Sequence, residues 1–248
     1  MSVERKRKPT PELEIQYHLP PEDLPLVDLL VTEDDEPVDN WYSERQRWLF
    51  SDPLYAGWRG GPTARPFVAA SDIGLFYALR QPPVVPDAFL SLDVQAPPNI
   101  WREGRAYFFW VYGKPPDVVC EVVSNKKGGE VNRKIPLYAQ LGIRYYIILD
   151  PMGRLRQGML RLYELTPTGY QIRQSLWMPD IGLGLTLWRG EYQGFEQTWL
   201  RWCDEHGTLY ATAAELADQE RIKADQEHAR AERLAERLRA LGIDPDQE

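Results

Sequence analysis

The sequence predicts an α/β fold in which a mixed sheet is flanked by helices and followed by a long C-terminal helix. Runs rich in β-branched and aromatic residues alternate with segments of helical composition. One run, from Tyr145 to Leu149, is entirely apolar, as is typical of a strand buried on both faces. The segment from Ala211 to Leu241 contains neither proline nor glycine, so we expect one continuous helix there.

Composition and charge limit the possible functions. The 248 residues are 43% hydrophobic, which is enough for a packed core. The formal net charge of −8 is concentrated near the C-terminus: residues 204–248 hold twelve acidic and six basic side chains, so residues 1–203 keep 25 of the 37 acids and 23 of the 29 bases. Tight nonspecific binding of nucleic acid usually needs a strongly basic protein, so any contact with a polyanion must be local.

The sequence has the features of a cytoplasmic protein. No apolar run approaches the roughly 20 residues that a membrane-spanning helix needs, so we expect no membrane partner. Residues 1–10 are charged and no apolar stretch follows them, unlike a secretory signal. Two cysteines and three scattered histidines cannot build a disulfide framework or a zinc site.

The N-terminal part is predicted to contain an irregular arm and one helix. Residues 1–40 are rich in proline and acidic side chains, which is typical of an arm without regular structure. A helix should begin at Trp41, because Asp39 or Asn40 can cap it. We expect this helix to end at Asp52-Pro53.

Three strands and a second helix should follow. Each strand is rich in β-branched or aromatic residues and is bounded by proline or glycine. The strands are expected within residues 66–77, 84–92 and 117–124. Residues 129–141 have helical composition, and Gly142 stands where a helix C-terminus favours a left-handed residue.

The rest of the predicted domain is a central strand and a hairpin. The apolar run at residues 145–149 belongs at the centre of the sheet. After it, residues 160–165 and 170–175 flank a Thr-Pro-Thr-Gly segment, which is typical of a hairpin. Three tryptophans are expected to pack in the core or against the tail: Trp188, Trp199 and Trp202. Residues 41–203 are thus predicted to form one domain, and residues 204–248 a charged helical tail.

The tail could join two copies of the chain. An Ala-Glu-Arg-Leu repeat occurs at residues 231–234 and again at residues 235–238. A heptad seam can be drawn through the tail, but Glu220 and Glu227 fall on it and weaken it. A coiled-coil homodimer and a solvated single helix therefore both remain open.

Glu121 is the most informative position for chemistry. Apolar residues surround it from Val118 to Val123, so the strand carries a carboxylate into an apolar environment. Burying an unpaired carboxylate costs several kcal/mol, and proteins accept this cost mainly where a cation or a hydrogen-bond network balances the charge. We therefore expect Glu121 to have a partner.

Asp87 can meet Glu121 from a neighbouring strand. It interrupts another strand-like run, and paired strands lie only about 4.8 Å apart. Two carboxylates repel each other unless a cation lies between them, and oxygen ligands without histidine or cysteine suit Mg²⁺ or Mn²⁺. Lys134, on the following helix, could position or deprotonate a water molecule, and Glu130 lies one turn earlier on the same side.

These segments resemble the Uma-type restriction endonuclease family of the PD-(D/E)XK nuclease superfamily. The resemblance rests on motifs in a fixed order and spacing. The motifs are Val-Pro-Asp at Val85–Asp87, Pro-Asp-Val-Val-Cys-Glu-Val-Val-Ser at Pro116–Ser124, Glu-Val-Asn-Arg-Lys-Ile-Pro-Leu-Tyr at Glu130–Tyr138, Leu-Gly-Ile at Leu141–Ile143, and Tyr-Tyr-Ile-Ile-Leu-Asp-Pro at Tyr145–Pro151. Weaker similarity extends to the first helix and to the charged tail.

The resemblance implies a restriction-endonuclease-like core and a DNA endonuclease. It implies that Asp87 and Glu121 hold Mg²⁺ and that Lys134 assists the attacking water. It also implies that Glu44, on the first helix, is an acid that acts through water. One departure is Val123, which occupies the position of the usual superfamily lysine. The family that this chain resembles supplies its lysine from the following helix instead.

Each assignment has an alternative. Pro136 lies two residues after Lys134, so Lys126 and Lys127 are alternative basic residues for catalysis or phosphate contact, or they are simply exposed. The two acids could form a buried structural pair balanced by Lys134 or Arg133. The whole chain could also be a catalytically inactive nuclease-fold module that binds protein partners through its tail.

Overall fold

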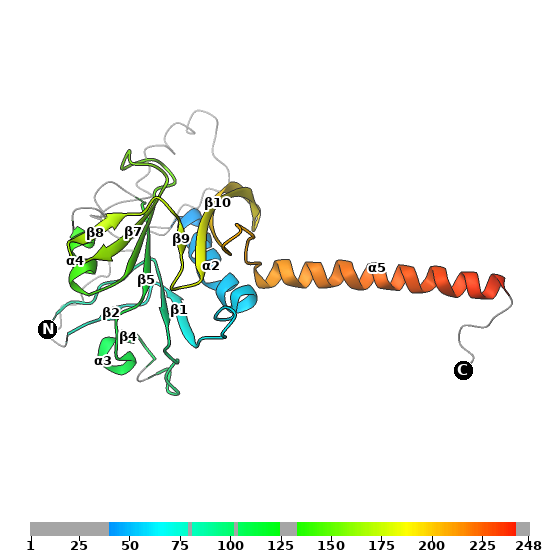
Figure 1. Ribbon diagram of the computed structural model, residues 1–248, viewed down its shortest axis with the longest axis horizontal. Coiled ribbons are helices and arrows are strands. Elements are labelled where there is room, and N and C mark those ends of the chain that lie inside the picture. Colours follow the sequence, from blue (N-terminus) through cyan, green and yellow to red (C-terminus); the bar gives the residue numbers. More distant parts are fainter. Residues whose placement is uncertain (1–39, 79–80, 102–103, 125–132, 242–248) are drawn as a thin grey trace, which may run out of the picture. The chain divides into compact units, whose positions relative to one another are not determined.

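The computed structural model describes residues 40–78, 81–101, 104–124 and 133–241. A six-stranded sheet forms its centre (Figure 1). The strands of this sheet, in spatial order, are β1 (Phe67–Ser71), β3 (Ala88–Leu92), β5 (Val118–Val122), β6 (Tyr145–Leu149), β7 (Leu160–Thr166) and β8 (Gly169–Ile172). Strands β5 and β6 are parallel and the other neighbouring pairs are antiparallel, so the sheet is mixed, as predicted.

Smaller sheets and the helices surround this central sheet. A three-stranded sheet consists of β9 (Trp177–Met178), β10 (Leu183–Tyr192) and β11 (Phe195–Cys203), and a two-stranded sheet consists of β2 (Leu75–Phe76) and β4 (Tyr107–Phe108). The helices are α2 (Trp41–Pro53), the π-helical turn η2 (Leu54–Trp58), α3 (Phe109–Tyr112), α4 (Ile135–Gln140) and α5 (Ala213–Ala240). The sequence predicted no strand after residue 175, so the β10–β11 hairpin is a correction. Its two-residue turn uses Gln193 and Gly194, which both have positive φ.

The first helix begins and ends where the sequence predicts, and a π-helical turn follows it. Asn40, rather than Asp39, is the N-cap, and its side chain accepts a hydrogen bond from the Ser43 amide. The predicted end of the α-helix at Pro53 is confirmed, but the chain continues directly into the π-helical turn η2, which the sequence did not predict and which stops at Arg59, whose φ is +53°. The core residues Phe50, Leu54 and Trp58 recur every four positions, so burial of this stripe outweighs the donor that proline lacks.

The strands predicted on either side of Asp87 are shorter than expected. The strand expected at residues 66–77 is split into β1 and β2, because Asp72 adopts a left-handed conformation with φ +54°. The strand expected at residues 84–92 begins only at Ala88, which leaves Asp87 immediately before it. The expected central position of β6 is confirmed, and all five of its residues are buried.

The second half of the sheet agrees with the sequence prediction. Strands β7 and β8 form the expected hairpin, in which Thr166 pairs with Gly169. Helix α4 ends as predicted, and Gly142 after it has φ +75°. Pro136 lies in the first turn of this helix, where a missing amide donor costs little. The predicted start of this helix at residue 129 lies outside the described residues.

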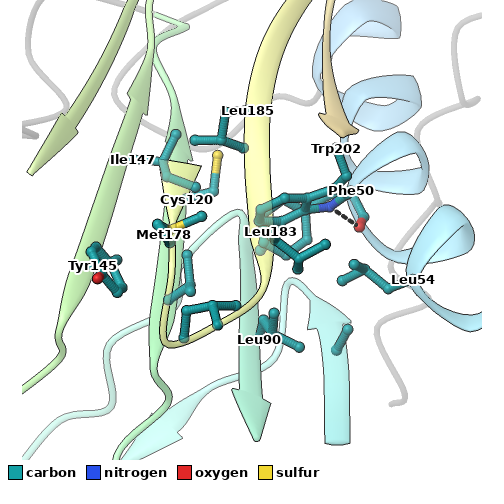
Figure 2. Packing of buried hydrophobic residues seen from close by; sticks show 14 of the residues in the cluster. Phe50, Leu54, Leu90, Cys120, Tyr145, Ile147, Met178, Leu183, Leu185 and Trp202 are labelled. Carbon is teal, nitrogen blue, oxygen red and sulfur yellow. Dashed lines mark hydrogen bonds between the residues drawn. The ribbon is translucent and has the colours of Figure 1, made fainter. Parts of the chain in front are cut away.

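The central sheet separates two apolar cores. On one face, Cys120 and Ile147 lie against Leu183 and Leu185 of β10 (Figure 2). The Trp202 indole donates a 2.7 Å hydrogen bond to the Phe50 carbonyl, which ties β11 to α2. The other face carries a second cluster, whose members include Val119, Val123, Tyr138, Tyr146, Ile148 and Tyr163. Because side chains alternate along a strand, Glu121 points into this second face, which α4 covers.

The predicted long helix near the C-terminus is present as α5 (Figure 1). Thr212 and Glu215 form a capping box at its start, and Arg201 binds both carboxylate oxygens of Glu215. None of the 28 residues of α5 is buried. Trp199 and Trp202 are buried as expected, whereas Trp188 is partly exposed and lies under the Arg201 guanidinium. In the described part of the chain, no helix has the length and apolar character of a membrane span.

Candidate active site

The strand register brings Asp87 and Glu121 together. Ala88 pairs with Cys120 in the antiparallel β3–β5 ladder, so the next opposed positions are Asp87 and Glu121. The Val122 amide donates a 2.7 Å hydrogen bond to Asp87 Oδ2, which fixes the aspartate beside β5. Opposed residues of neighbouring strands share a face of the sheet, so the two acids lie side by side.

The Glu121 carboxyl group is held between two side chains that come from the α4 region. The Lys134 ammonium donates to Oε2 at 2.6 Å, and the Tyr138 hydroxyl donates to Oε1 at 2.5 Å. Glu121 is only 2% exposed, whereas the Lys134 and Asp87 side chains are each 22% exposed. The glutamate therefore forms the buried floor of the site, and the lysine and aspartate form its accessible edge.

Burial controls the protonation of Glu121. Loss of hydration raises the pKa of its carboxyl group to about 8; Lys134 opposes this rise and Asp87 adds to it. At neutral pH the carboxyl group therefore mostly keeps its proton, although Lys134 is its direct neighbour. A further cation that binds here has to displace that proton, so binding should strengthen as the pH rises.

Tyr138 is a site residue that the sequence analysis did not single out. It lies four residues after Lys134, so both side chains project from the same side of the chain toward Glu121. Burial raises its pKa well above the ordinary tyrosine value, and the neighbouring Glu121 raises it further, so the hydroxyl stays a donor. The spacing of four residues from Lys134 was the sequence feature that could have identified Tyr138 as a site residue.

Arg47 is the second residue that sequence reasoning missed. This side chain of α2 is buried; its Nε atom lies 2.9 Å from Asp72 Oδ2 and its Nη1 atom lies 3.7 Å from Asp87 Oδ1. The signal was its position between Ser43 and Phe50 on the buried stripe of the helix. Arg47 links the first helix to the acid pair and partly neutralises Asp87.

The remaining predicted residues are placed as follows. Glu44 forms an ion pair with Arg45 at 2.6 Å and lines a pocket of about 480 Å³ together with Arg47 and Trp48. Arg47 of the same helix forms the ion pair with Asp87. Lys134, rather than Arg133, pairs with Glu121. Three predicted accessory residues lie outside the described residues: Lys126, Lys127 and Glu130.

The two carboxyl groups could hold a divalent ion. Once Glu121 is ionised, each of its oxygens accepts one hydrogen bond and has two lone pairs, so both oxygens keep acceptor capacity. Among the described residues, no group of three or more histidine, cysteine, aspartate or glutamate side chains is close enough to share an ion. A two-carboxylate site suits Mg²⁺, which usually binds one or two carboxylates and fills its other positions with water or phosphate oxygens.

Comparison with known proteins agrees with the motifs. A family model, Uma2, described as "Putative restriction endonuclease", matches residues 28–187. A solved structure from Anabaena variabilis ATCC 29413, described as a putative nuclease belonging to DUF820, is 15% identical; the alignment has a TM-score of 0.41 and covers 58% of this chain and 76% of that chain. A search of curated proteins gave no match. The family match confirms the resemblance seen in the motifs, and because it spans more than half of the chain, this protein belongs to the Uma2 family of restriction-endonuclease-like proteins.

Proposed function

We propose that this protein is a Mg²⁺-dependent endonuclease that hydrolyses phosphodiester bonds in DNA, with Mn²⁺ as a possible substitute ion. Family membership supports a nuclease. The observation that carries the proposal is the Glu121 carboxyl group, which is buried beside Asp87 and receives hydrogen bonds from Lys134 and Tyr138. An apolar side chain would be more stable at this position, so function is the better explanation for the acid.

Each residue would have a distinct task in this reaction. Asp87 and Glu121 would hold the ion, which when bound would offset the negative charge that develops on the phosphate. Lys134 would orient the attacking water or stabilise the developing charge, because its ammonium is partly exposed directly above Glu121. Tyr138 would keep the Glu121 carboxyl group in one orientation, and Arg47 would do the same for Asp87.

Cleavage of supercoiled plasmid tests the proposal. We expect the wild-type protein with Mg²⁺ to open and linearise the circle, and we expect Asp87→Ala and Glu121→Gln to lose at least about 100-fold in rate. Lys134→Met should lower the cleavage rate by roughly 100-fold or more, the usual effect of removing a general acid or base. Asp117→Asn is a matched control, because Asp117 is also 22% exposed beside a strand end but pairs with Lys114. Equal cleavage by the wild type and the Asp87 and Glu121 variants would contradict the proposal.

A second candidate function is that of an inactive nuclease-fold module that binds partner proteins through α5. The observation in its favour is that none of the α5 side chains is buried. Calorimetry separates the two functions, because the module needs no metal. Mg²⁺ binding that is lost in Glu121→Gln would count against the module, whereas unchanged binding would count against the metal site.

A further inference from the structure

A row of opposed residues crosses the central sheet through the acid pair. Asp87 faces Glu121, Glu121 pairs with Ile148, and Ile148 pairs with Arg161 of β7. Directly opposed residues project to the same face of a sheet. Arg161 therefore lies on the face that carries Glu121, two strands away from it, at a distance of about 10 Å for two strand spacings.

The Arg161 guanidinium is anchored by one nitrogen and has two others without partners. Its Nη1 atom donates to the Gln157 side-chain oxygen and, at 3.2 Å, to the Tyr163 hydroxyl. Arg161 is 4% exposed, and its Nε and Nη2 atoms are buried without a hydrogen-bond partner among the described residues. These two nitrogens form one edge of the planar group, and such an edge binds two oxygens of a phosphate or carboxylate in parallel.

Arg201 shows how this chain balances the charge of a buried arginine that serves the fold, although its Nε atom also lacks a hydrogen-bond partner. It is 1% exposed, and its Nη1 and Nη2 atoms bind the two oxygens of Glu215 at 3.0 and 2.7 Å. No carboxylate of the described residues answers Arg161 in this way. A buried cationic edge without an acceptor destabilises a protein. The Nε and Nη2 atoms of Arg161 therefore need an anionic partner that the described residues do not supply.

We infer that Arg161 is a phosphate-binding residue that receives a backbone phosphate of the nucleic-acid strand through Nε and Nη2. A nucleic-acid strand advances about 3.4 Å per nucleotide, so a phosphate at Arg161 lies within about three nucleotides of a bond cleaved at Glu121. That the anion belongs to a nucleic-acid strand rests on the proposed function. That a phosphate-like anion binds here rests only on the buried, unpartnered nitrogens of Arg161.

The anion can reach Arg161 through a small local movement. Both free nitrogens are covered in the structure, so an anion reaches them only when the guanidinium turns; its partner Gln157 is an exposed side chain that can release Nη1 for such a turn. The expected binding geometry therefore needs no rearrangement of the sheet.

Thermal unfolding with inorganic phosphate tests this site without cleavage. The full chain is melted without divalent ions in increasing phosphate, at constant ionic strength set with chloride, as wild type, Arg161→Met and Arg201→Met. Phosphate should raise the wild-type Tm by a few degrees, because a ligand that binds only the folded state stabilises it. Arg161→Met should lose this response while its Tm without phosphate is equal to or higher than that of the wild type, since an apolar side chain replaces an unpaired charge. Arg201→Met should have a lower Tm and keep the response.

Two results would overturn the inference: a wild-type Tm that does not respond to phosphate, or an Arg161→Met response equal to that of the wild type. If Arg161→Met does not fold, Arg161→Lys decides, because lysine keeps the charge but loses the two-nitrogen edge. Its response should fall to less than half, and a full response would refute the site. Since these melts need neither metal nor cleavage, failure of the nuclease proposal and failure of this site are distinguishable.

Discussion

At the residue scale, the site depends on one carboxyl group in a place that favours an apolar side chain. Glu121 lies between Val119 and Val123 on the same face of β5, and this conflict is visible in the sequence. Asp87 and Lys134 were also predictable as its partners, because few residues on a neighbouring strand or on the following helix can reach Glu121. Arg161 was not predictable, since a long-range register brings it to the row of acids and the local sequence does not encode that register. For Arg47 the sequence offered only its position on the buried stripe of α2, which does not reveal its partner Asp87.

The raised pKa of Glu121 predicts how stability depends on pH. The carboxyl group has a pKa of about 8 in the folded protein and an ordinary value of 4.5 when exposed, so the folded state holds an extra proton between these two pH values. This contribution to stability is complete below about pH 4.5, declines by at most about 1.4 kcal/mol per pH unit, and is lost above about pH 8. Urea unfolding at pH 5.5 and pH 8.5 should therefore show Glu121→Gln gaining stability relative to the wild type at the higher pH.

Glu164→Gln is the control for this pH effect. Burial raises the pKa of Glu164, but hydrogen bonds from Arg173 and Arg144 outweigh it, and the pKa lies below its ordinary value. Its contribution to stability is thus lost only when the pH falls through that low value. We expect Glu164→Gln to be less stable than the wild type by the same amount at pH 5.5 and pH 8.5. A constant difference for Glu121→Gln as well would show that Glu121 ionises normally.

Tyr138→Phe tests whether the hydroxyl group orients Glu121 for ion binding. Loss of a ligand-orienting hydrogen bond typically weakens metal binding 10- to 100-fold, so we expect Mg²⁺ affinity measured by calorimetry to fall by about that factor. Stability should fall by only about 1 kcal/mol. Tyr170→Phe is the control, because it also removes a tyrosine hydrogen bond, a part-buried one donated to the Ile143 carbonyl at 2.5 Å. That variant should lose stability and keep its affinity for Mg²⁺; equal Mg²⁺ affinities in both variants would remove Tyr138 from the site.

At the element scale, local patterns predicted β6, the β7–β8 hairpin and α5, because each has its own signal in composition, turn residues or helix caps. The β10–β11 hairpin escaped prediction, since exposed charged residues interrupt its apolar pattern and its turn is Gln-Gly rather than a stronger turn pair. The split between β1 and β2 also escaped, because an aspartate with positive φ is set by its surroundings. The same aspartate, Asp72, is the partner of Arg47.

The start of α5 offers a prediction about a single element. Thr212 caps the helix by accepting from the Glu215 amide, and the Glu215 side chain accepts from the Thr212 amide. Replacement of an N-cap threonine by alanine usually costs about 1 kcal/mol, so Thr212→Ala should unfold at lower urea concentration by that amount. Hydrogen exchange should accelerate over the first turn of α5. Thr168→Ala, in the exposed turn between β7 and β8, should change the free energy of unfolding by no more than about 0.5 kcal/mol and should leave hydrogen exchange in α5 unchanged.

At the scale of the whole molecule, the predicted site is assembled by the central sheet. Asp87, which immediately precedes β3, forms one row with Glu121 of β5 and Arg161 of β7, although these residues are far apart in the sequence. The predicted α/β class and the family were accessible from the ordered motifs, because both depend on the sequence of elements. The row itself was not, since a shift of one residue in any register would turn its side chains to the opposite face.

The tail yields the last prediction, which concerns assembly. None of the α5 side chains is buried, and Leu234 and Leu241 expose apolar surface on the predicted heptad seam, so we propose that α5 joins two copies of the chain. A chain that ends after Asp218 keeps the Glu215–Arg201 pair. It should therefore melt within a few degrees of the full chain and bind Mg²⁺ equally well. Light scattering should find the full chain dimeric and the shortened chain monomeric.

The double variant Glu220→Leu with Glu227→Leu should dimerise more tightly than the wild type, because it removes the two acids from the heptad seam. A monomeric full chain would refute the coiled coil, and a large fall in Tm on shortening would show that α5 stabilises the domain itself.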